Sequence, residues 1–239
     1  MIPKIIHYCW FGRGEMPKEA KKCIASWHEL MPDYEYKLWN EDAFDVNSVS
    51  YTKEAYEVHK FAFVSDYVRL WALEREGGVY LDTDVEVFRS FDDLLGYKAF
   101  AGFEGSKHLP LGTCVMASVA HGEWVTEQLK AYENRHFLKP DGICDLTTNV
   151  QFITAIMRGK GFIQNGKEQD YKDMHVFPVE YFSPRNTMGE YIRTEHTYAN
   201  HLGLGTWDKN AKDWKTVLLK RLGQRNATRL IKLKRKFFG

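Results

Sequence analysis

Apolar and polar positions in the first forty residues follow two alternating periods. Residues 2–11 form an apolar and aromatic run that stops at a glycine-rich loop, which predicts a buried first strand. Helical spacing from Pro17 or Lys18 to Leu30 predicts a helix that ends before Pro32, and residues 34–39 alternate like a second strand. Strand, helix and strand in so short a span predict an α/β fold with a mostly parallel central sheet flanked by helices.

The next apolar run is long enough to be a buried helix. Residues 61–73 are apolar nearly all round, with Ser65, Asp66 and Arg69 as the polar members, and Gly77-Gly78 suits the helix end. A strand at residues 79–88 is expected next, and period two divides it into an apolar and an acidic face. The apolar face holds Val79, Leu81, Val85 and Val87, and the acidic face holds Asp82, Asp84 and Glu86.

Further helices are expected at residues 122–134 and 149–158, and residues 159–200 are expected to be loops and short strands.

Composition adds limits to this picture. The 239 residues predict one compact domain over 1–212 with a tail over 213–239. A formal net charge of +1 argues against attraction of the whole protein to nucleic acid or membrane. The four cysteines show no CxxC spacing, so reduced core thiols are expected. No apolar stretch near Met1 is long enough for a signal peptide or anchor, and we expect a cytoplasmic protein.

The acidic face of the predicted strand suggests a metal site. Like charges on one face repel each other unless a cation or solvent intervenes, and hard oxygen ligands suit Mg²⁺ or Mn²⁺. A metal held there could bridge the phosphates of a diphosphate and neutralise charge on the leaving group. The alternative is an amphipathic strand with its polar face in solvent, because Asp-x-Asp occurs by chance about once in a chain of this length.

The preceding helix strengthens the metal hypothesis. Asp66 and Arg69 are three residues apart and therefore project from one side of an otherwise apolar helix. A buried structural ion pair would explain them equally well. A polar ligand pocket would use the guanidinium as a donor to phosphate or sugar oxygens and the carboxylate as an acceptor from sugar hydroxyls.

Three motifs in order resemble the family 32 glycosyltransferases, whose sugar-binding region carries a DXD motif. They are residues 2–12 (IPKIIHYCWFG), 65–69 (SDYVR) and 77–84 (GGVYLDTD). The resemblance is dense over residues 1–120. It implies a GT-A fold, a nucleotide-diphospho-sugar donor such as a UDP-sugar, Mn²⁺ or Mg²⁺, and retention of anomeric configuration. It also implies a glycan or lipid-linked saccharide acceptor in bacterial capsular or other surface polysaccharide synthesis.

The resemblance also assigns roles to residues of these motifs. Trp10 would stack on the nucleobase, although a core tryptophan is an equal alternative. Asp66 and Arg69 would bind the transferred sugar and act in catalysis. Asp82 would contact ribose and sugar hydroxyls, and Asp84 would ligate the metal. The donor-binding set would also include Tyr8 and Thr83.

Further candidates follow from the resemblance in the second half of the chain. His201 would complete the metal shell, with His196 as an alternative. Trp207 would donate its indole N–H to the leaving diphosphate, and Thr206 replaces the commoner serine before it. Asn149 and Gln151 fall where related enzymes contact the sugar, where many members have Gly-Pro instead. Helix capping by Thr148 or Asn149 is the alternative interpretation of that segment.

From Trp214 onward the chain contains basic residues and no acidic ones. From residue 214 onward nine Lys and Arg side chains accompany apolar positions at helical spacing. Two interpretations stay open: a helix on an anionic membrane surface at the inner face of the membrane, or a helix packed on the domain. Nucleic-acid binding is not expected, because no motif accompanies the charge.

Parts of the sequence also fit two other function classes. A phosphohydrolase of the haloacid dehalogenase type also has Asp-x-Asp after an apolar strand, but it expects Thr or Val where Glu86 stands. A non-catalytic carbohydrate-binding module would explain the aromatic residues but not the buried Asp66 and Arg69.

Overall fold

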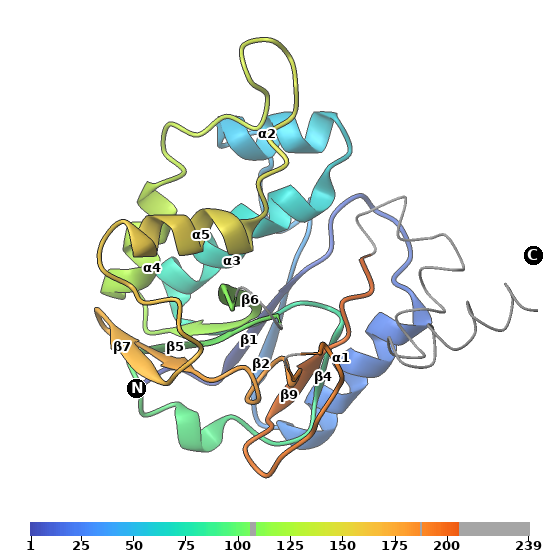
Figure 1. Cartoon of the computed structure of the whole chain (residues 1–239). Helices are drawn as coiled ribbons and strands as arrows, with labels where there is room; N and C mark the ends of the chain where they lie inside the picture. Colours follow the sequence, from blue (N-terminus) through green and yellow to red (C-terminus); the bar gives the residue numbers. More distant parts are fainter. Residues whose placement is uncertain (106–108, 187, 206–239) are drawn as a thin grey trace, which may run out of the picture.

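A β-sheet with helices on both faces forms the centre of the molecule (Figure 1). The computed structural model describes residues 1–105, 109–186 and 188–205. Its elements are β1 (Ile5–Cys9), α1 (Lys18–Leu30), β2 (Glu35–Trp39), α2 (Ser50–Glu57), α3 (Phe61–Glu76), β3 (Gly78–Leu81), β4 (Val85–Val87), the 3₁₀ turn η1 (Asp92–Leu94), β5 (Ala99–Phe103), β6 (Leu111–Ser118), α4 (Glu123–Lys130), α5 (Asn149–Arg158), β7 (Gln169–Tyr171), β8 (Met174–Phe177) and β9 (Ala199–His201). The predicted tail lies outside the described residues.

The α/β fold class is confirmed, and the sheet is mixed. Within the described residues the strand order is β2-β1-β3-β6-β5-β8-β7. Parallel pairing joins β1 to β2 and β3, and β5 to β8. The expectation of a mostly parallel sheet holds for the run β2, β1 and β3, and elsewhere in the described sheet only for the pair β5 and β8. The reason is that β6 lies between β3 and β5 and runs antiparallel to both, and β7 runs antiparallel to β8.

The predicted strand at residues 79–88 is two strands with a turn between them. The Val85 N–H donates to the Asp82 carbonyl at 3.0 Å, the hydrogen bond between the first and fourth residues of a β-turn. After this turn β4 leaves the central sheet and pairs antiparallel with β9. The predicted single acidic face is therefore wrong: Asp82 and Asp84 lie in the turn, and Glu86 is exposed on β4.

Two apolar clusters pack on opposite faces of the sheet. One lies between the sheet and the helices α2 to α5, and the other lies against α1, β4 and β9 (Figure 1). The second cluster contains the four valine and leucine side chains of the predicted apolar face, Val79, Leu81, Val85 and Val87. Asp82 therefore comes directly after the part of β3 that packs on this core.

Glycines shape the connection from α3 to β3. Gly77 has φ 66° and Gly78 has φ 113°, values that side chains rarely adopt. A Cβ on Gly77 would be 2.7 Å from the Ala120 backbone N, so the site has no space for a side chain. The helix end predicted at these glycines is confirmed, and it delivers β3 directly beside β1.

The other predicted helices are also present. The helix expected from Pro17 or Lys18 to Leu30 is α1, that expected at 149–158 is α5, and that expected at 122–134 is the shorter α4. Among the described residues, no helix combines the length and apolarity needed to cross a bilayer.

Candidate functional site

A cleft of about 710 Å³ opens where β1 and β3 end. Its volume falls in the range of small-molecule sites, roughly 300–1,000 Å³. Crevices at the carboxyl ends of strands are the usual ligand sites of α/β sheets. Of the predicted site residues, eight line this cleft: Trp10, Asp66, Arg69, Asp82, Thr83, Asp84, Asn149 and His201.

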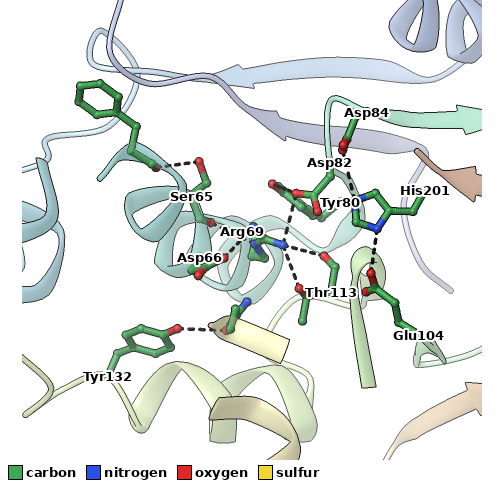
Figure 2. A network of polar contacts seen from close by, with 12 residues as sticks. Ser65, Asp66, Arg69, Tyr80, Asp82, Asp84, Glu104, Thr113, Tyr132 and His201 are labelled. Atoms are coloured by element: carbon green, nitrogen blue, oxygen red, sulfur yellow. Dashed lines mark hydrogen bonds and ion pairs between the residues drawn. The ribbon is translucent and has the colours of Figure 1, made fainter. Parts of the chain in front are cut away.

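Arg69 of α3 connects the two halves of the polar site (Figure 2). Its Nη2 lies 2.8 Å from Asp66 Oδ1, and its Nη1 lies 3.3 Å from Asp82 Oδ1. Nη1 also donates to the Thr113 carbonyl at 2.8 Å, and the guanidinium lies over the Tyr80 ring at 4.7 Å. These contacts leave the Arg69 side chain 6% exposed. The prediction that Asp66 and Arg69 project together from α3 is confirmed.

Burial controls the protonation of the two aspartates that Arg69 contacts. Burial raises the pKa of Asp66 to about 6, more than the neighbouring Arg69 lowers it. Burial also raises the pKa of Asp82, again against the effect of Arg69. Tyr80 donates a hydrogen bond to Asp82 Oδ1 at 2.9 Å, which favours the ionised carboxylate. The site therefore holds these carboxylates against a desolvation cost, a pattern that is common in functional sites.

Asp84 and His201 meet on the other side of Asp82. Asp84 Oδ1 lies 3.4 Å from His201 Nε2, and Asp84 Oδ2 accepts the Leu204 N–H at 2.8 Å. Burial by itself raises the pKa of Asp84, but His201 and the Leu204 N–H outweigh it and the pKa is lowered. Pairing of β4 with β9 puts Val85 opposite His201, which explains why residues so distant in sequence are neighbours.

Asp82, Asp84 and His201 could hold a divalent cation. One ligand atom from each residue lies within 4.8 Å of the others. Two carboxylates and one imidazole suit Mn²⁺, which accepts both oxygen and nitrogen donors. The residues present therefore fit the ion that the DXD resemblance implies.

Aromatic side chains also line the cleft. Trp10, Phe11 and Phe61 line it, and the Trp10 indole N–H donates to the Gly14 carbonyl at 2.6 Å. Tyr8 does not line the cleft. Its ring contacts Trp27 edge-on at 5.6 Å, whereas the next residue, Cys9, lines the cleft, because successive residues of β1 point to opposite faces of the sheet.

Asn149 combines a capping position with a place in the cleft. Thr148 is the N-cap of α5 and forms a capping box with Gln151, so the capping interpretation of this segment is confirmed. Asn149 itself is buried, and its Oδ1 accepts a hydrogen bond from Tyr132 at 3.0 Å. Its Nδ2 has no partner among the described residues, and a buried donor without a partner is expected to meet a ligand or water.

The remaining predicted residues are Thr206, Trp207 and the alternative metal ligand His196. Thr206 and Trp207 lie outside the described residues. His196 is exposed and stacks on Tyr181, away from the group that could hold a metal.

Sequence reasoning missed Glu104, which follows β5 and lines the cleft. It follows a buried apolar strand as Asp82 does, so the same signal could have found it.

Comparison with known proteins identifies the region around these motifs. Residues 17–101 match the family model described as "Glycosyltransferase sugar-binding region containing DXD motif". Inositol phosphoceramide mannosyltransferase 3 of Schizosaccharomyces pombe is 36% identical over 103 residues, 41% of this chain and 29% of that protein. Mannosyl phosphorylinositol ceramide synthase SUR1 of Saccharomyces cerevisiae is 31% identical over 140 residues, 56% of this chain and 35% of that protein. The chain thus spans about a third of the length of these relatives.

A solved structure has a similar fold. The PaToxG glycosyltransferase superposes with a TM-score of 0.50 at 18% identity, covering 67% of this chain and 70% of that one. Over the superposed part, the chain therefore shares the fold of that protein. The family match includes α3, which holds Asp66 and Arg69, and the turn after β3, which holds Asp82 and Asp84. Residues 17–101 of the chain therefore carry a glycosyltransferase sugar-binding region with its DXD motif.

Proposed function

We propose that this protein transfers a hexose, with retention, from a nucleotide-diphospho-sugar to a hydroxyl group of a glycan or lipid-linked acceptor. The observation that carries the proposal is the position of Arg69 between Asp66 and Asp82, with Asp84 and His201 beside them in one cleft. A phosphohydrolase or a binding module does not account for that set together with the family match.

Each side chain has a role that its surroundings support. Trp10, Phe11 and Phe61 in the cleft offer aromatic faces for the nucleobase. Asp66 and Asp82 can accept hydrogen bonds from hydroxyls of the sugar and ribose. Arg69 fixes both carboxylates beside the sugar and favours their ionised form against the effect of burial. Asn149 Nδ2 offers a further donor to the sugar.

A divalent cation, Mn²⁺ or Mg²⁺, would be held by Asp84 and His201 with Asp82 beside them. When bound, it would neutralise the charge that develops on the leaving nucleoside diphosphate. The chain's own contribution there is to orient Asp84, whose second oxygen is occupied by the Leu204 N–H.

The donor and acceptor are proposed by class. The names of two relatives specify mannosyl transfer to an inositol phosphoceramide, which supports a hexose donor and a lipid-linked acceptor. GDP-mannose therefore joins the UDP-sugars as a donor to be tested first. Turnover of one donor from such a panel, measured as release of nucleoside diphosphate, assigns the nucleotide.

The first test is binding. Mn²⁺ together with UDP or GDP at about one hundred times the Kd should raise Tm by about 5 to 10 °C, because a ligand that binds only the native state stabilises it by mass action. Differential scanning fluorimetry measures the shift, and each component alone is the control. An unchanged Tm with every nucleoside diphosphate in the presence of Mn²⁺ would contradict the proposal.

The second test uses pH. Turnover should fall below about pH 6, because protonated Asp66 no longer accepts hydrogen bonds from the sugar as a carboxylate. The free energy of unfolding should instead increase as the pH falls through this window. The folded-state pKa of Asp66 is raised from 3.8 to about 6, so its ionisation costs folding free energy as pH rises through that window.

The effect of pH on stability is measured against Asp66→Asn, which cannot ionise at this position. The free energy of unfolding of the wild type, relative to Asp66→Asn, should decrease between about pH 4 and pH 6 in urea titrations. A relative stability that increases with pH over that window would show that Asp66 is an ordinary salt-bridged carboxylate instead.

A further inference from the structure

Glu104 faces His201 from the end of β5 (Figure 2). Its Oε1 lies 2.9 Å from His201 Nδ1, while His201 Nε2 points to Asp84 Oδ1 at 3.4 Å. The imidazole therefore lies between two carboxylates that come from different strand ends. Glu104 lies outside the three family motifs, which span residues 2–12, 65–69 and 77–84.

An imidazole ligates a metal through one nitrogen and carries a proton on the other. The partner of the protonated nitrogen fixes the tautomer and the ring orientation. With Glu104 accepting from Nδ1–H, the lone pair of Nε2 faces Asp84, on the side where Asp82 and Asp84 offer oxygen ligands. This is the arrangement in which His201 can complete that ligand set.

The chain is built to leave room for this carboxylate. The Glu104 N–H donates to the Pro110 carbonyl at 2.9 Å, which fixes its backbone at the start of β6. A Cβ on Gly112 would lie 3.0 Å from Glu104 Cβ and 3.2 Å from Oε2, closer than most real contacts. The pairing of β5 with β6 also shifts register between Ala101 and Phe103, and such irregularities re-aim the residues that follow.

A second group around His201 offers an alternative. Ligand atoms of Glu104, Cys114 and His201 also lie within 4.8 Å of one another, and such a mixed donor set suits Zn²⁺. Two observations favour the first group. Cys114 is 3% exposed and does not line the cleft, whereas Asp82 and Asp84 do. Glu104 Oε1 is also already at hydrogen-bond distance from Nδ1.

We propose that Glu104 is a positioning residue, which holds the His201 ring so that Nε2 serves the metal site formed with Asp82 and Asp84. The proposal rests on the proposed function, because it assumes that these residues bind a divalent cation.

The experiment measures Mn²⁺ affinity of the full chain without donor. Glu104→Gln should raise the Kd for Mn²⁺ by about 10- to 100-fold, the usual effect of losing such a partner. Free Mn²⁺ is followed by its electron paramagnetic resonance signal. Glu74→Gln is the matched control, because Glu74 also pairs with a histidine Nδ1, that of His121 at 2.8 Å, outside the cleft. Its Kd should equal that of the wild type.

A double-mutant cycle separates positioning from direct ligation. In a His201→Ala background, Glu104→Gln should have no further effect on the Kd, because Glu104 acts through the ring. If Glu104→Gln does not fold, Gly112→Ala replaces it, since it keeps every ligand and displaces the carboxylate. That variant should also weaken Mn²⁺ binding.

The outcomes are distinct. Equal Mn²⁺ affinity of wild type and Glu104→Gln overturns the role of Glu104 and leaves the proposed function standing. A wild type that does not bind Mn²⁺ overturns both. Loss of Mn²⁺ affinity in Cys114→Ser as large as that in Glu104→Gln would assign the ion to the Glu104, Cys114 and His201 group, and that too overturns the proposal.

Discussion

Arg69→Met should destabilise the protein by about 3–5 kcal/mol and abolish sugar transfer, the largest combined effect expected of a single substitution here. The substitution keeps much of the side-chain volume but removes the charge between Asp66 and Asp82. Both carboxylates would remain buried and face each other without a cation, and the Thr113 carbonyl would lose its donor. Urea unfolding measures the stability, and release of nucleoside diphosphate measures the transfer.

The control for this change lies on the same helix. Arg75 is exposed near the end of α3, with its guanidinium over the Trp71 ring. Arg75→Met should change the free energy of unfolding by no more than about 0.5 kcal/mol. Arg69→Lys keeps the charge but not the planar fork, so it should recover part of the stability and little of the transfer. Equal stability of Arg69→Met and Arg75→Met would show that the buried ion pairs do not hold the site together.

Asp84→Asn should reduce transfer by about 10²–10³-fold and remove the dependence of nucleoside diphosphate binding on Mn²⁺. The amide oxygen can still accept the Leu204 N–H, so the fold should be retained. Isothermal titration with Mn²⁺ and nucleoside diphosphate measures the binding, and Tm reports the fold.

Glu86→Gln is the matched control for Asp84→Asn. It makes the same charge change two residues further along, on an exposed position of β4. Its transfer rate and Mn²⁺ dependence should equal those of the wild type. If Asp84→Asn kept wild-type turnover, the metal would have to be held elsewhere and the DXD assignment would be wrong.

Local periodicity was sufficient to predict the half of the site that lies on α3. An apolar run with two charges three residues apart allows one helical geometry, and in it Asp66 and Arg69 face the same way. The cost of burying a charge alone then requires a partner or a ligand nearby. Both requirements depend on neighbours in sequence, and the structure agrees with them.

The other half of the site depends on contacts that no local pattern contains. Alternation from residue 79 to 88 fits one strand as well as two short strands around a turn. The pairing of β4 with β9, which follows more than a hundred residues later in the chain, decides in favour of two strands. Glu86 therefore faces solvent although it keeps the same spacing as Asp82 and Asp84. Tyr8, next to a cleft residue in sequence, faces the opposite side for a similar reason, since alternation in β1 decides its direction.

The late partner of β4 has a consequence for the newly made chain. The strands β1, β2 and β3 and the helix α3 are all complete by residue 81, so the Asp66 and Arg69 pair can form early during synthesis. Asp84, however, obtains its neighbour His201 only when residues 199–201 have left the ribosome and added β9. A nascent chain, or a fragment cleaved before Ala199, would therefore hold the sugar-binding half without the completed cation site. The candidate cation site would be completed in one late step.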